Sequence, residues 1–165
     1  MIVNYLNNGG VQKCTREEIE RVLNLSLNTL EQKADMEVNI AFVSGEEIRQ
    51  VNNKNRNKDS ATDVLSFPAF ELNAGEIVDL AQDKYKWNIN PENGHFLLGD
   101  ILLCTEVAKK QAKALKHSLK LELVRLSVHS LLHLLGYDHI QEKDQPVMHK
   151  KEMECMKQAG YEIIE

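Results

Sequence analysis

The segment from Ser118 to Leu135 constrains the fold of this chain more than any other, because it is apolar on most of its helical circumference. A helix with apolar residues on nearly every side is stable only when other elements bury it. Ser118 is a typical N-cap residue, and Gly136 is placed to end the helix. We therefore expect a central helix with the rest of the chain packed around it.

One polar line interrupts this apolar helix. Glu122, Arg125, His129 and His133 follow each other at intervals of three, four and four residues. Such intervals stack side chains along one face of a helix. Buried polar groups need partners, so the sequence predicts that other protein groups or a ligand satisfy this line.

The length of the chain, 165 residues, suits one compact domain, and we expect residues 1–165 to form it. Apolar residues make up 42% and charged residues 27%, as in ordinary globular proteins. No apolar run is long enough to cross a membrane, and the N-terminus lacks the features of a signal peptide. These features predict a cytoplasmic protein without a membrane partner.

The cysteines at positions 14, 104 and 155 are far apart and form no Cys-x-x-Cys pair. This spacing argues against a disulfide framework and against a zinc site made of cysteines alone. We expect Cys14, Cys104 and Cys155 to be buried, reduced thiols.

Apolar periodicity and capping residues predict the other elements. Thr15 and Ser44 each open a capping box, and the run from Phe96 is apolar enough for a strand buried on both faces. The expected helices cover residues 15–30, 44–51, 105–115, 118–135 and 144–160, and the expected strands cover 37–43, 63–67 and 96–104. The 37–43 strand alternates and should be half-buried. The fold class is α/β (α+β): a small, mostly buried mixed sheet packed by about five helices.

Two stretches lack apolar periodicity. Residues 52–60 are polar, basic and rich in turn formers, which predicts an exposed loop. Residues 70–95 show no clear period, and we expect a long loop excursion from the domain, partly ordered by Trp87.

The histidines at the end of the central helix predict a metal site. His129 and His133 are four residues apart, so their Cβ atoms should lie about 5–6 Å from each other on one helix face. After Gly136 the chain can turn back and bring His139 to the pair. Three imidazoles that leave one position for water are typical of catalytic zinc, which lowers the pKa of bound water toward about 7.

Two other interpretations of these histidines stay open. Their spacing can arise by chance among ordinary core and surface histidines. Alternatively, the zinc is structural, with Cys104 or Cys155 as a fourth ligand. Three histidines within eleven residues favour metal binding over the first of these.

The spacing from His129 to His139 matches the metzincin protease pattern His-Glu-x-x-His-x-x-Gly-x-x-His. The proteases carry their proton-accepting glutamate at the second position, and this chain has Ser130 there. A serine hydroxyl is no base near neutral pH, so the usual route of peptide hydrolysis lacks its base.

At these positions the sequence resembles the YbeY family of bacterial endoribonucleases, which are zinc-dependent rRNA maturation factors. The family's hallmark is similar to residues 129–139, and further signatures are similar to Asn55-Arg56 with residues 62–68 and to residues 98–101. Ser130 replaces a glycine of the family pattern, and Ala61 stands where a proline usually precedes Thr62. The resemblance covers most of the chain.

The resemblance implies that His129, His133 and His139 hold one Zn²⁺ per chain and that Arg56 is the functional arginine. It implies a single-strand-specific endoribonuclease that acts at the 3′ end of 16S rRNA and in ribosome quality control. The partners would be rRNA and the small ribosomal subunit or its assembly factors, with no DNA expected. Independently, a guanidinium that forks onto phosphate would stabilise the charge of phosphodiester cleavage.

RNA binding needs a local basic surface, because the formal net charge is −5. Lys109, Lys113, Lys116 and Lys120 recur at helical intervals and form a candidate stripe, which a helix break near His117 would interrupt. In the polar line, Glu122 can orient Arg125. Asp138 is placed to orient a metal-binding histidine.

Two other functions remain as alternatives. The chain can be a zinc-containing ribosome-assembly factor that binds RNA or a ribosomal protein without catalysis. It can also be a metzincin-like protease, or another small-molecule metallohydrolase, that lacks the usual glutamate base. Metal-ligand variants that keep RNA binding and lose only cleavage would separate the first from a nuclease.

Overall fold

The computed structural model describes residues 1–32, 35–72, 76–78, 83–137 and 145–162. Within these residues the chain forms a four-stranded sheet, five α-helices and one short 3-10 helix, η1. The strands are β1 (Ile2–Tyr5), β2 (Met36–Val43), β3 (Val64–Pro68) and β4 (Phe96–Cys104). The helices are α1 (Lys13–Thr29), α2 (Gly45–Arg56), η1 (Asp83–Asn88), α3 (Thr105–Ala114), α4 (Leu119–Leu134) and α5 (Gln145–Gln158).

The strands follow the order β1-β2-β4-β3 across the sheet. Strand β2 pairs in parallel with β1 and with β4, and β3 pairs antiparallel with β4. The expected α+β fold with a small mixed sheet and about five helices is therefore confirmed. The sequence analysis missed β1, because this edge strand has only four residues and none of them is fully buried.

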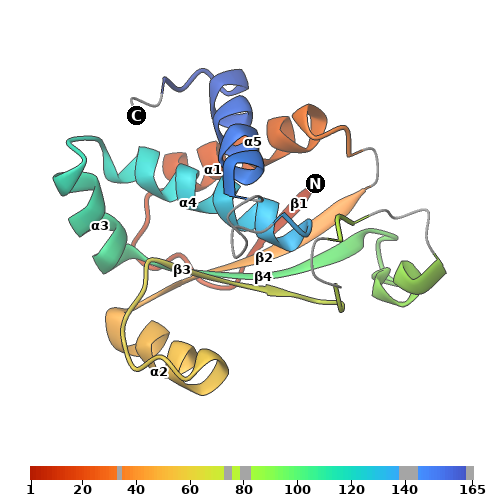
Figure 1. Cartoon of the computed structure of the whole chain (residues 1–165), viewed down its shortest axis with the longest axis horizontal. Coiled ribbons are helices and arrows are strands. Elements are labelled where there is room, and N and C mark those ends of the chain that lie inside the picture. The colour runs from red at the N-terminus through yellow and green to blue at the C-terminus, as the bar shows by residue number, and fades with distance from the viewer. Residues whose placement is uncertain (33–34, 73–75, 79–82, 138–144, 163–165) are drawn as a thin grey trace.

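Helices α1, α4 and α5 cover one face of the sheet, and α2 lies on the other side (Figure 1). The central helix is α4, which contacts α1, α3, α5, β3 and β4. Most of its apolar side chains are buried, and Leu123, Val124 and Leu131 are fully buried. Each buried leucine or valine contributes about 1.5–3 kcal/mol relative to exposure. No described helix is long and apolar enough to cross a membrane.

The capping predictions were right at two helices and wrong at two others. The hydroxyl groups of Ser44 and Ser118 accept hydrogen bonds from the starts of α2 and α4, as expected. Helix α1 begins earlier than predicted, so Thr15 lies inside it, and Gln12 at the N-cap makes no side-chain capping bond. Thr105 is the first helical residue of α3 rather than its cap.

Helix α2 is longer than predicted, so the expected loop over residues 52–60 is wrong for 52–56. The side chain of Asn52 is buried and donates a hydrogen bond to the carbonyl oxygen of Ser60. The helix ends where Asn57 takes a left-handed conformation with φ of 54°. Because of this extension, Arg56 lies on the last turn of a helix and not in a loop.

Strand β2 is buried on both faces, and the half-buried prediction was wrong. It is an inner strand between β1 and β4, and most of its residues are buried. Even Glu37 is only 4% exposed, because Asn90 and Asn93 each donate a side-chain hydrogen bond to its carboxylate. Residues from the 70–95 excursion therefore cover a polar position of the sheet.

Trp87 does not order the excursion over residues 70–95, since it is 92% exposed. The excursion is held instead by Val78 and Tyr85, which are buried in the main core. The Tyr85 ring meets Phe70 and Phe96 at centroid distances of 5.3 and 5.9 Å. Aromatic contacts at these distances are favourable, so the excursion is anchored to the domain.

Gly136 ends α4 with φ of +94°, as its place after the helix predicted. A Cβ atom there would lie 2.0 Å from the carbonyl oxygen of Glu76. We expect Gly136→Ala to lower the free energy of unfolding by about 2–4 kcal/mol, measured by denaturant titration. The control is Gly160→Ala, where φ is +87° but no atom lies within 4 Å. Equal losses in both variants would show that the contact with Glu76 is unimportant.

Candidate metal centre

The two histidines of α4 point their ring nitrogens at each other. The Nε2 atoms of His129 and His133 are 3.2 Å apart, and their rings are nearly perpendicular, at 80°. Both side chains belong to the polar line of α4 and are half-buried, whereas most of the helix is buried. The four-residue spacing thus places two potential ligand atoms side by side, as predicted.

The histidine pair fits a tetrahedral zinc ion. Zinc binds imidazole nitrogens at about 2.0–2.1 Å, so two ligands at a tetrahedral angle lie roughly 3.3–3.4 Å apart. The observed separation of 3.2 Å is close to this value. In the described part of the chain, no group of three or more His, Cys, Asp or Glu side chains is placed to hold a metal. The predicted third ligand, His139, and also Asp138, lie outside the described residues.

Behind His129 lies a carboxylate that the sequence analysis missed. Glu152 of α5 accepts a hydrogen bond of 2.9 Å from Nδ1 of His129 and is only 8% exposed. With Nδ1 donating to this carboxylate, Nε2 is left as the nitrogen that can bind a metal. Glu152 and His129 are 23 positions apart, and no sequence motif links them. The only sequence feature that predicted a partner for His129 was the buried polar line of α4.

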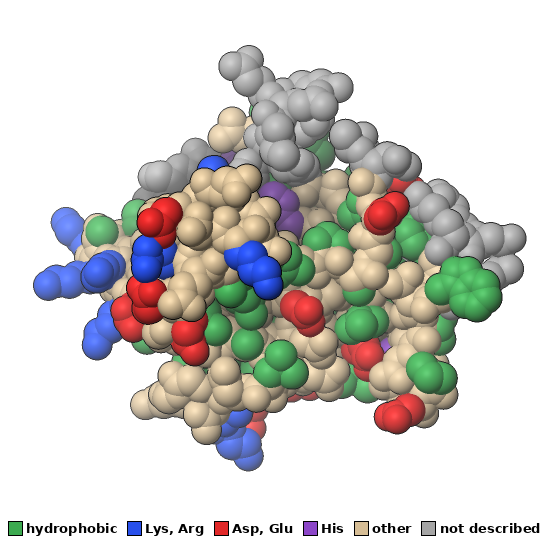
Figure 2. Space-filling model, turned by 90° about the horizontal axis from the view of Figure 1, so that it is seen from below, with side chains coloured by type: hydrophobic (Ala, Val, Ile, Leu, Met, Phe, Trp, Pro, Cys, Tyr) green, Lys and Arg blue, Asp and Glu red, His purple; other side chains and the backbone are tan. Residues whose placement is uncertain are grey.

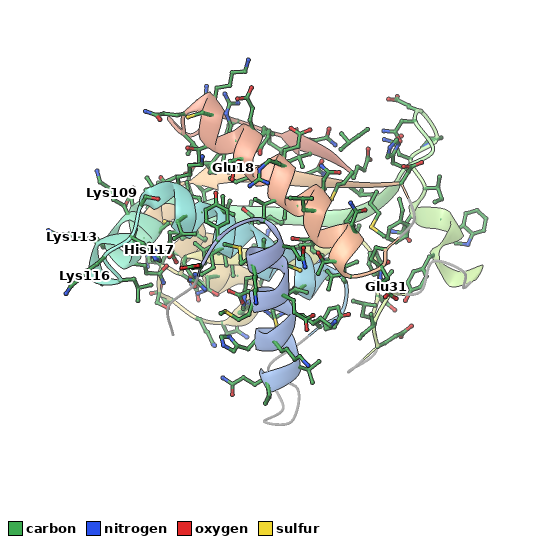
Figure 3. All side chains as sticks on the ribbon, turned by 90° about the horizontal axis from the view of Figure 1, so that it is seen from above. Glu18, Glu31, Lys109, Lys113, Lys116 and His117 are labelled. Atoms are coloured by element: carbon green, nitrogen blue, oxygen red, sulfur yellow. The ribbon has the colours of Figure 1, made fainter. Side chains whose placement is uncertain are left out.

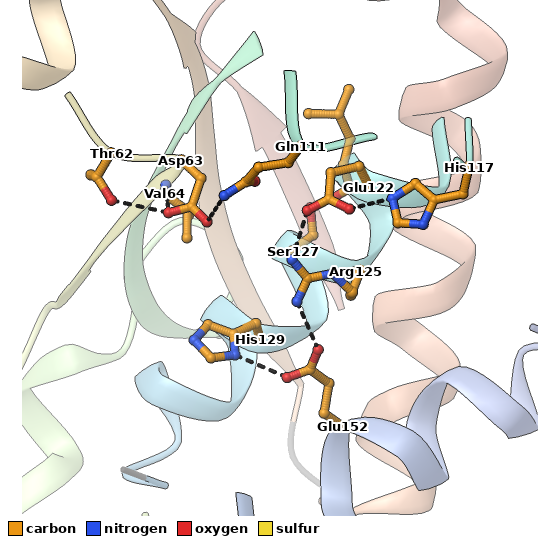
Figure 4. A network of polar contacts seen from close by, with 11 residues as sticks. Thr62, Asp63, Val64, Gln111, His117, Glu122, Arg125, Ser127, His129 and Glu152 are labelled. Carbon is orange, nitrogen blue, oxygen red and sulfur yellow. Dashed lines mark hydrogen bonds and ion pairs between the residues drawn. The ribbon is translucent and has the colours of Figure 1, made fainter. Parts of the chain in front are cut away.

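Glu152 belongs to a buried network along α4 (Figure 4). Arg125 donates to Glu152 over 3.3 Å and to the fully buried Glu122 over 2.6 Å. Glu122 also lies 2.5 Å from Nε2 of His117. The sequence prediction that Glu122 orients Arg125 is therefore confirmed. The network joins the start of α4 to the candidate metal ligand.

The charges in this network stabilise one another. Burial raises the pKa of the Glu152 carboxyl, but the hydrogen bond from His129 and the charge of Arg125 outweigh this and lower it overall. Burial lowers the pKa of Arg125, and its two carboxylate partners raise it overall. A buried ion pair with such partners is held in one geometry, because removing either charge would leave the other unpaired.

The histidine pair and Arg56 share one cavity of about 300 Å³. Helix α4 supplies one wall and the stretch from Thr62 to Ser66 supplies another. Figure 2 shows histidine surface in a recess of this side of the molecule. The residues that line this cavity are Arg56, Thr62, Asp63, Val64, Ser66, Arg125, Leu126, His129 and His133. Residues more than 70 positions apart in the chain thus meet at one site, as the motif analysis required.

Asp63 is a second residue of this cavity that the sequence analysis did not single out. Burial raises its pKa, but hydrogen bonds from Gln111, Thr62 and the backbone of Val64 lower it overall. The bond from Gln111 is 3.0 Å long and ties Asp63 to α3. A carboxylate that already accepts three hydrogen bonds, and whose pKa is lowered, is a poor proton acceptor at neutral pH. Asp63 therefore holds the cavity wall in place.

Neither Ser130 nor the cysteines line this cavity. Ser130 is fully buried, and its hydroxyl group has no hydrogen-bond partner among the described residues. Cys104 packs with Ile48 and Leu65, and Cys155 lies in the main core. Cys104 and Cys155 are buried and free as predicted, but Cys14 is exposed, so that prediction was wrong. The arrangement gives no support to a cysteine as fourth ligand.

The lysine stripe is interrupted. Helix α3 ends at Ala114, and Lys116 has a left-handed conformation, with φ of 57°. Lys113 and Lys116 lie at the outer end of α3 in Figure 3, whereas Lys120 belongs to α4. A continuous stripe along one helix face is therefore absent, as a helix break near His117 implied.

A histidine pair backed by a buried carboxylate, with an arginine on the same cavity, is typical of hydrolases that act with a metal ion. Sequence comparison identifies the particular family. The family model described as Endoribonuclease YbeY matches residues 2–160. The chain therefore belongs to the Endoribonuclease YbeY family, as its motifs suggested.

Individual relatives agree with the family. An Endoribonuclease YbeY from Lachnospira eligens is 41% identical over 130 residues, covering 76% of this chain and 77% of the relative. One from Bacillus pumilus is 39% identical and covers 92% and 90% of the two chains. One from Clostridium botulinum strain Loch Maree is 34% identical and covers 94% and 95%.

A solved structure shares the fold. The solution structure of a Thermotoga maritima protein matches with a TM-score of 0.58 over 96% of this chain and 89% of that one. At 24% sequence identity, this likeness supports the architecture of the chain alone.

Proposed function

We propose that this protein is a zinc-dependent endoribonuclease that cuts single-stranded RNA during rRNA maturation. The observation that carries the proposal is the shared cavity of Arg56, His129 and His133 in a member of an endoribonuclease family. In this proposal the enzyme cuts at the 3′ end of 16S rRNA. It also takes part in ribosome quality control. The small ribosomal subunit or its assembly factors would be the partners, in the cytoplasm.

The zinc ligands in this proposal are His129, His133 and His139. Zinc supplies a Lewis acid for a phosphate oxygen and lowers the pKa of water. The protein's own part is to hold the imidazoles in place. Glu152 fixes the ring of His129 through Nδ1, and Arg125 fixes Glu152. A ligand held in this way loses little conformational freedom when it binds the ion.

Arg56 would act on the phosphate. Cleavage of a phosphodiester concentrates negative charge on its nonbridging oxygens, and a guanidinium can bind two of them at once. Arg56 is exposed on the last turn of α2 and lines the same cavity as His129 and His133. Its side chain can therefore reach an incoming phosphate without being buried beforehand.

Single-stranded RNA is the substrate in this proposal. The cavity of about 300 Å³ is at the small end of the range for ligand sites. A single strand can bend a phosphate into such a space and splay its bases apart, whereas a stacked duplex cannot. Figure 2 shows Lys and Arg side chains at one end of this side of the molecule, with Asp and Glu side chains among them, so the basic surface there is not continuous.

A protease is the weaker alternative on structural grounds. The position that holds the catalytic glutamate in metzincins is Ser130, and it lies in the core rather than in the cavity. Changing this residue to glutamate would bury a charge instead of creating a base.

The proposal is tested with protein of measured zinc content and labelled RNA of defined structure. We expect cleavage of the single strand, little cleavage of the duplex, and loss of activity after chelation with recovery on adding zinc. Peptide substrates serve as the control for the protease alternative. A zinc-loaded protein that binds RNA but never cuts it would instead support the non-catalytic assembly factor.

We expect Glu152→Gln to weaken zinc binding by about 10–100-fold, because glutamine cannot accept the Nδ1 proton of His129 as a charged group does. Zinc affinity is measured by competition with a chelator of known affinity. The matched control is Glu154→Gln on the same helix, whose carboxylate pairs with Lys151 near the surface. Equal zinc affinity in both variants would show that Glu152 does not position the ligand.

A further inference from the structure

His117 is a polar residue to which the proposed reaction assigns no role. It lies between α3, which ends at Ala114, and α4, whose N-cap residue is Ser118. Its side chain is only 21% exposed, and its Nε2 atom lies 2.5 Å from the carboxylate of the fully buried Glu122. Figure 4 shows His117 at one end of the polar network whose other end is His129.

The contacts of this network are symmetrical. Glu122 and Glu152 each accept a hydrogen bond from Arg125 with one carboxylate oxygen and contact a histidine ring with the other. The two bonds from Arg125 differ in length, because it lies 2.6 Å from Glu122 and 3.3 Å from Glu152. The bond between Arg125 and Glu152 is therefore the weakest contact between His117 and His129.

Two other pairs of glutamate and arginine in this chain lie three residues apart on a helix. Arg21 donates from Nε and Nη2 to both carboxylate oxygens of Glu18, over 2.9 and 2.7 Å. Arg49 donates from Nε and Nη2 to both oxygens of Glu46, over 3.0 and 2.9 Å. Two parallel bonds between a guanidinium and a carboxylate are strong and fix the geometry of both groups. The spacing of three residues thus allows a two-point contact.

Glu122 and Arg125 have the same spacing but make only half of this contact. Nη2 of Arg125 donates to Oε1 of Glu122. Nε of Arg125 is buried and has no hydrogen-bond partner in the described part of the chain. Oε2 of Glu122, the atom that Nε would bind, is in contact with His117 instead. A buried donor without a partner is costly, so this exception to the pattern needs a cause, and His117 supplies it.

Without the imidazole of His117, the freed oxygen of Glu122 would attract Nε of Arg125 into the two-point contact. The guanidinium would then turn toward Glu122. Its bond from Nη1 to Glu152 is already 3.3 Å long, so we expect this bond to be lost. Glu152 would keep His129 as its remaining partner in the network and would be held at one point only.

We propose that His117 is a positioning residue for the candidate metal ligand His129. It keeps Arg125 shared between the two carboxylates, so that Glu152 stays aligned on Nδ1 of His129. The expected effect on metal affinity rests on the zinc site of the proposed function. The expected effect on the ring of His129 does not.

The test uses two variants that differ by one methylene group. In His117→Gln the amide nitrogen can reach the place of Nε2 and donate to Glu122, whereas in His117→Asn the side chain is too short. We expect His117→Asn to weaken zinc binding about 3–10-fold, less than the loss of the direct partner Glu152, because it acts from one contact further away. His117→Gln should retain the zinc affinity of the unmodified protein. The matched control is His95→Asn, which makes the same change in the turn before β4.

A spectroscopic measurement separates positioning from a purely structural role. The proton on Nδ1 of His129 is followed by NMR in the full-length protein, with and without zinc. We expect its signal to shift and to exchange faster with water in His117→Asn, and to be unchanged in His117→Gln and His95→Asn. A purely structural role would lower the free energy of unfolding, measured by denaturant titration, without changing this signal.

The coupling between His117 and Glu152 completes the test. Because His117 is proposed to act through Glu152, His117→Asn should leave zinc affinity nearly unchanged in a protein that already carries Glu152→Gln. The proposal is overturned if the two losses of affinity add, or if His117→Asn keeps both the zinc affinity and the His129 signal. It is also overturned if His117→Gln behaves like His117→Asn. If the unmodified protein binds no zinc, the proposed function fails, and the His129 signal still tests the role of His117.

Discussion

Cleavage of single-stranded RNA by His133→Ala is expected to fall by at least about 100–1000-fold, with most of the bound zinc lost. The Nε2 atoms of His133 and His129 are 3.2 Å apart, so removing one imidazole takes away a ligand that the other cannot replace. Zinc content is measured by elemental analysis on the same sample as the cleavage rate. The two losses should appear together.

His95→Ala is the matched control for this experiment. His95 is partly exposed in the turn before β4, where its ring hydrogen-bonds to the carbonyl oxygen of Asn93. We expect it to keep zinc and activity. His139→Ala extends the test to the predicted third ligand, which lies outside the described residues. Full zinc occupancy in His133→Ala or His139→Ala would remove that residue from the metal site.

The part of the site that lies on one helix was predictable from the sequence. The intervals between Glu122, Arg125, His129 and His133 depend only on helical geometry, which local sequence sets. The surrounding apolar residues identified the helix as buried, and α4 is the centre of the fold. Local periodicity therefore sufficed for the pair of histidines and for the contact between Glu122 and Arg125.

The parts that come from other elements were not predictable in the same way. Glu152 reaches His129 from α5, and Asp63 reaches the cavity from the end of a loop. Both contacts depend on how helices and strands pack, which no local pattern encodes. The polar line predicted that partners existed, but their identity needed the three-dimensional arrangement.

The errors in the fold have similar causes. Strand β1 is too short and too exposed to show an alternation of apolar and polar residues. Strand β2 was predicted to have one face in solvent, because its sequence alternates in this way. The asparagines that cover Glu37 lie more than fifty residues away. Helix α2 was predicted too short because its last turns are polar, although Asn52 is buried by a bond to Ser60. In β1 and β2, pairing and contacts with distant parts of the chain override the local signal.

Arg56 was assigned by family resemblance, and its placement on the cavity now allows a sharper test. We expect Arg56→Lys to lower the rate of RNA cleavage on the order of 10–1000-fold, with zinc content and folding unchanged. Lysine keeps the positive charge but loses the planar fork that binds two phosphate oxygens. Because this contact would strengthen in the transition state, kcat should fall more than RNA affinity.

Arg49→Lys is the control, since Arg49 lies on the same helix and pairs with Glu46 and Asp59 away from the cavity. It should cleave RNA at the rate of the unmodified protein. If Arg56→Lys also cleaves at that rate, with full zinc, then charge alone is needed and two-point binding of phosphate is wrong. If Arg56→Ala is equally active, Arg56 has no part in the reaction, and the charge on the nonbridging oxygens must be met elsewhere in the cavity. Arg125 is the other guanidinium in the lining, but Glu122 and Glu152 already hold it.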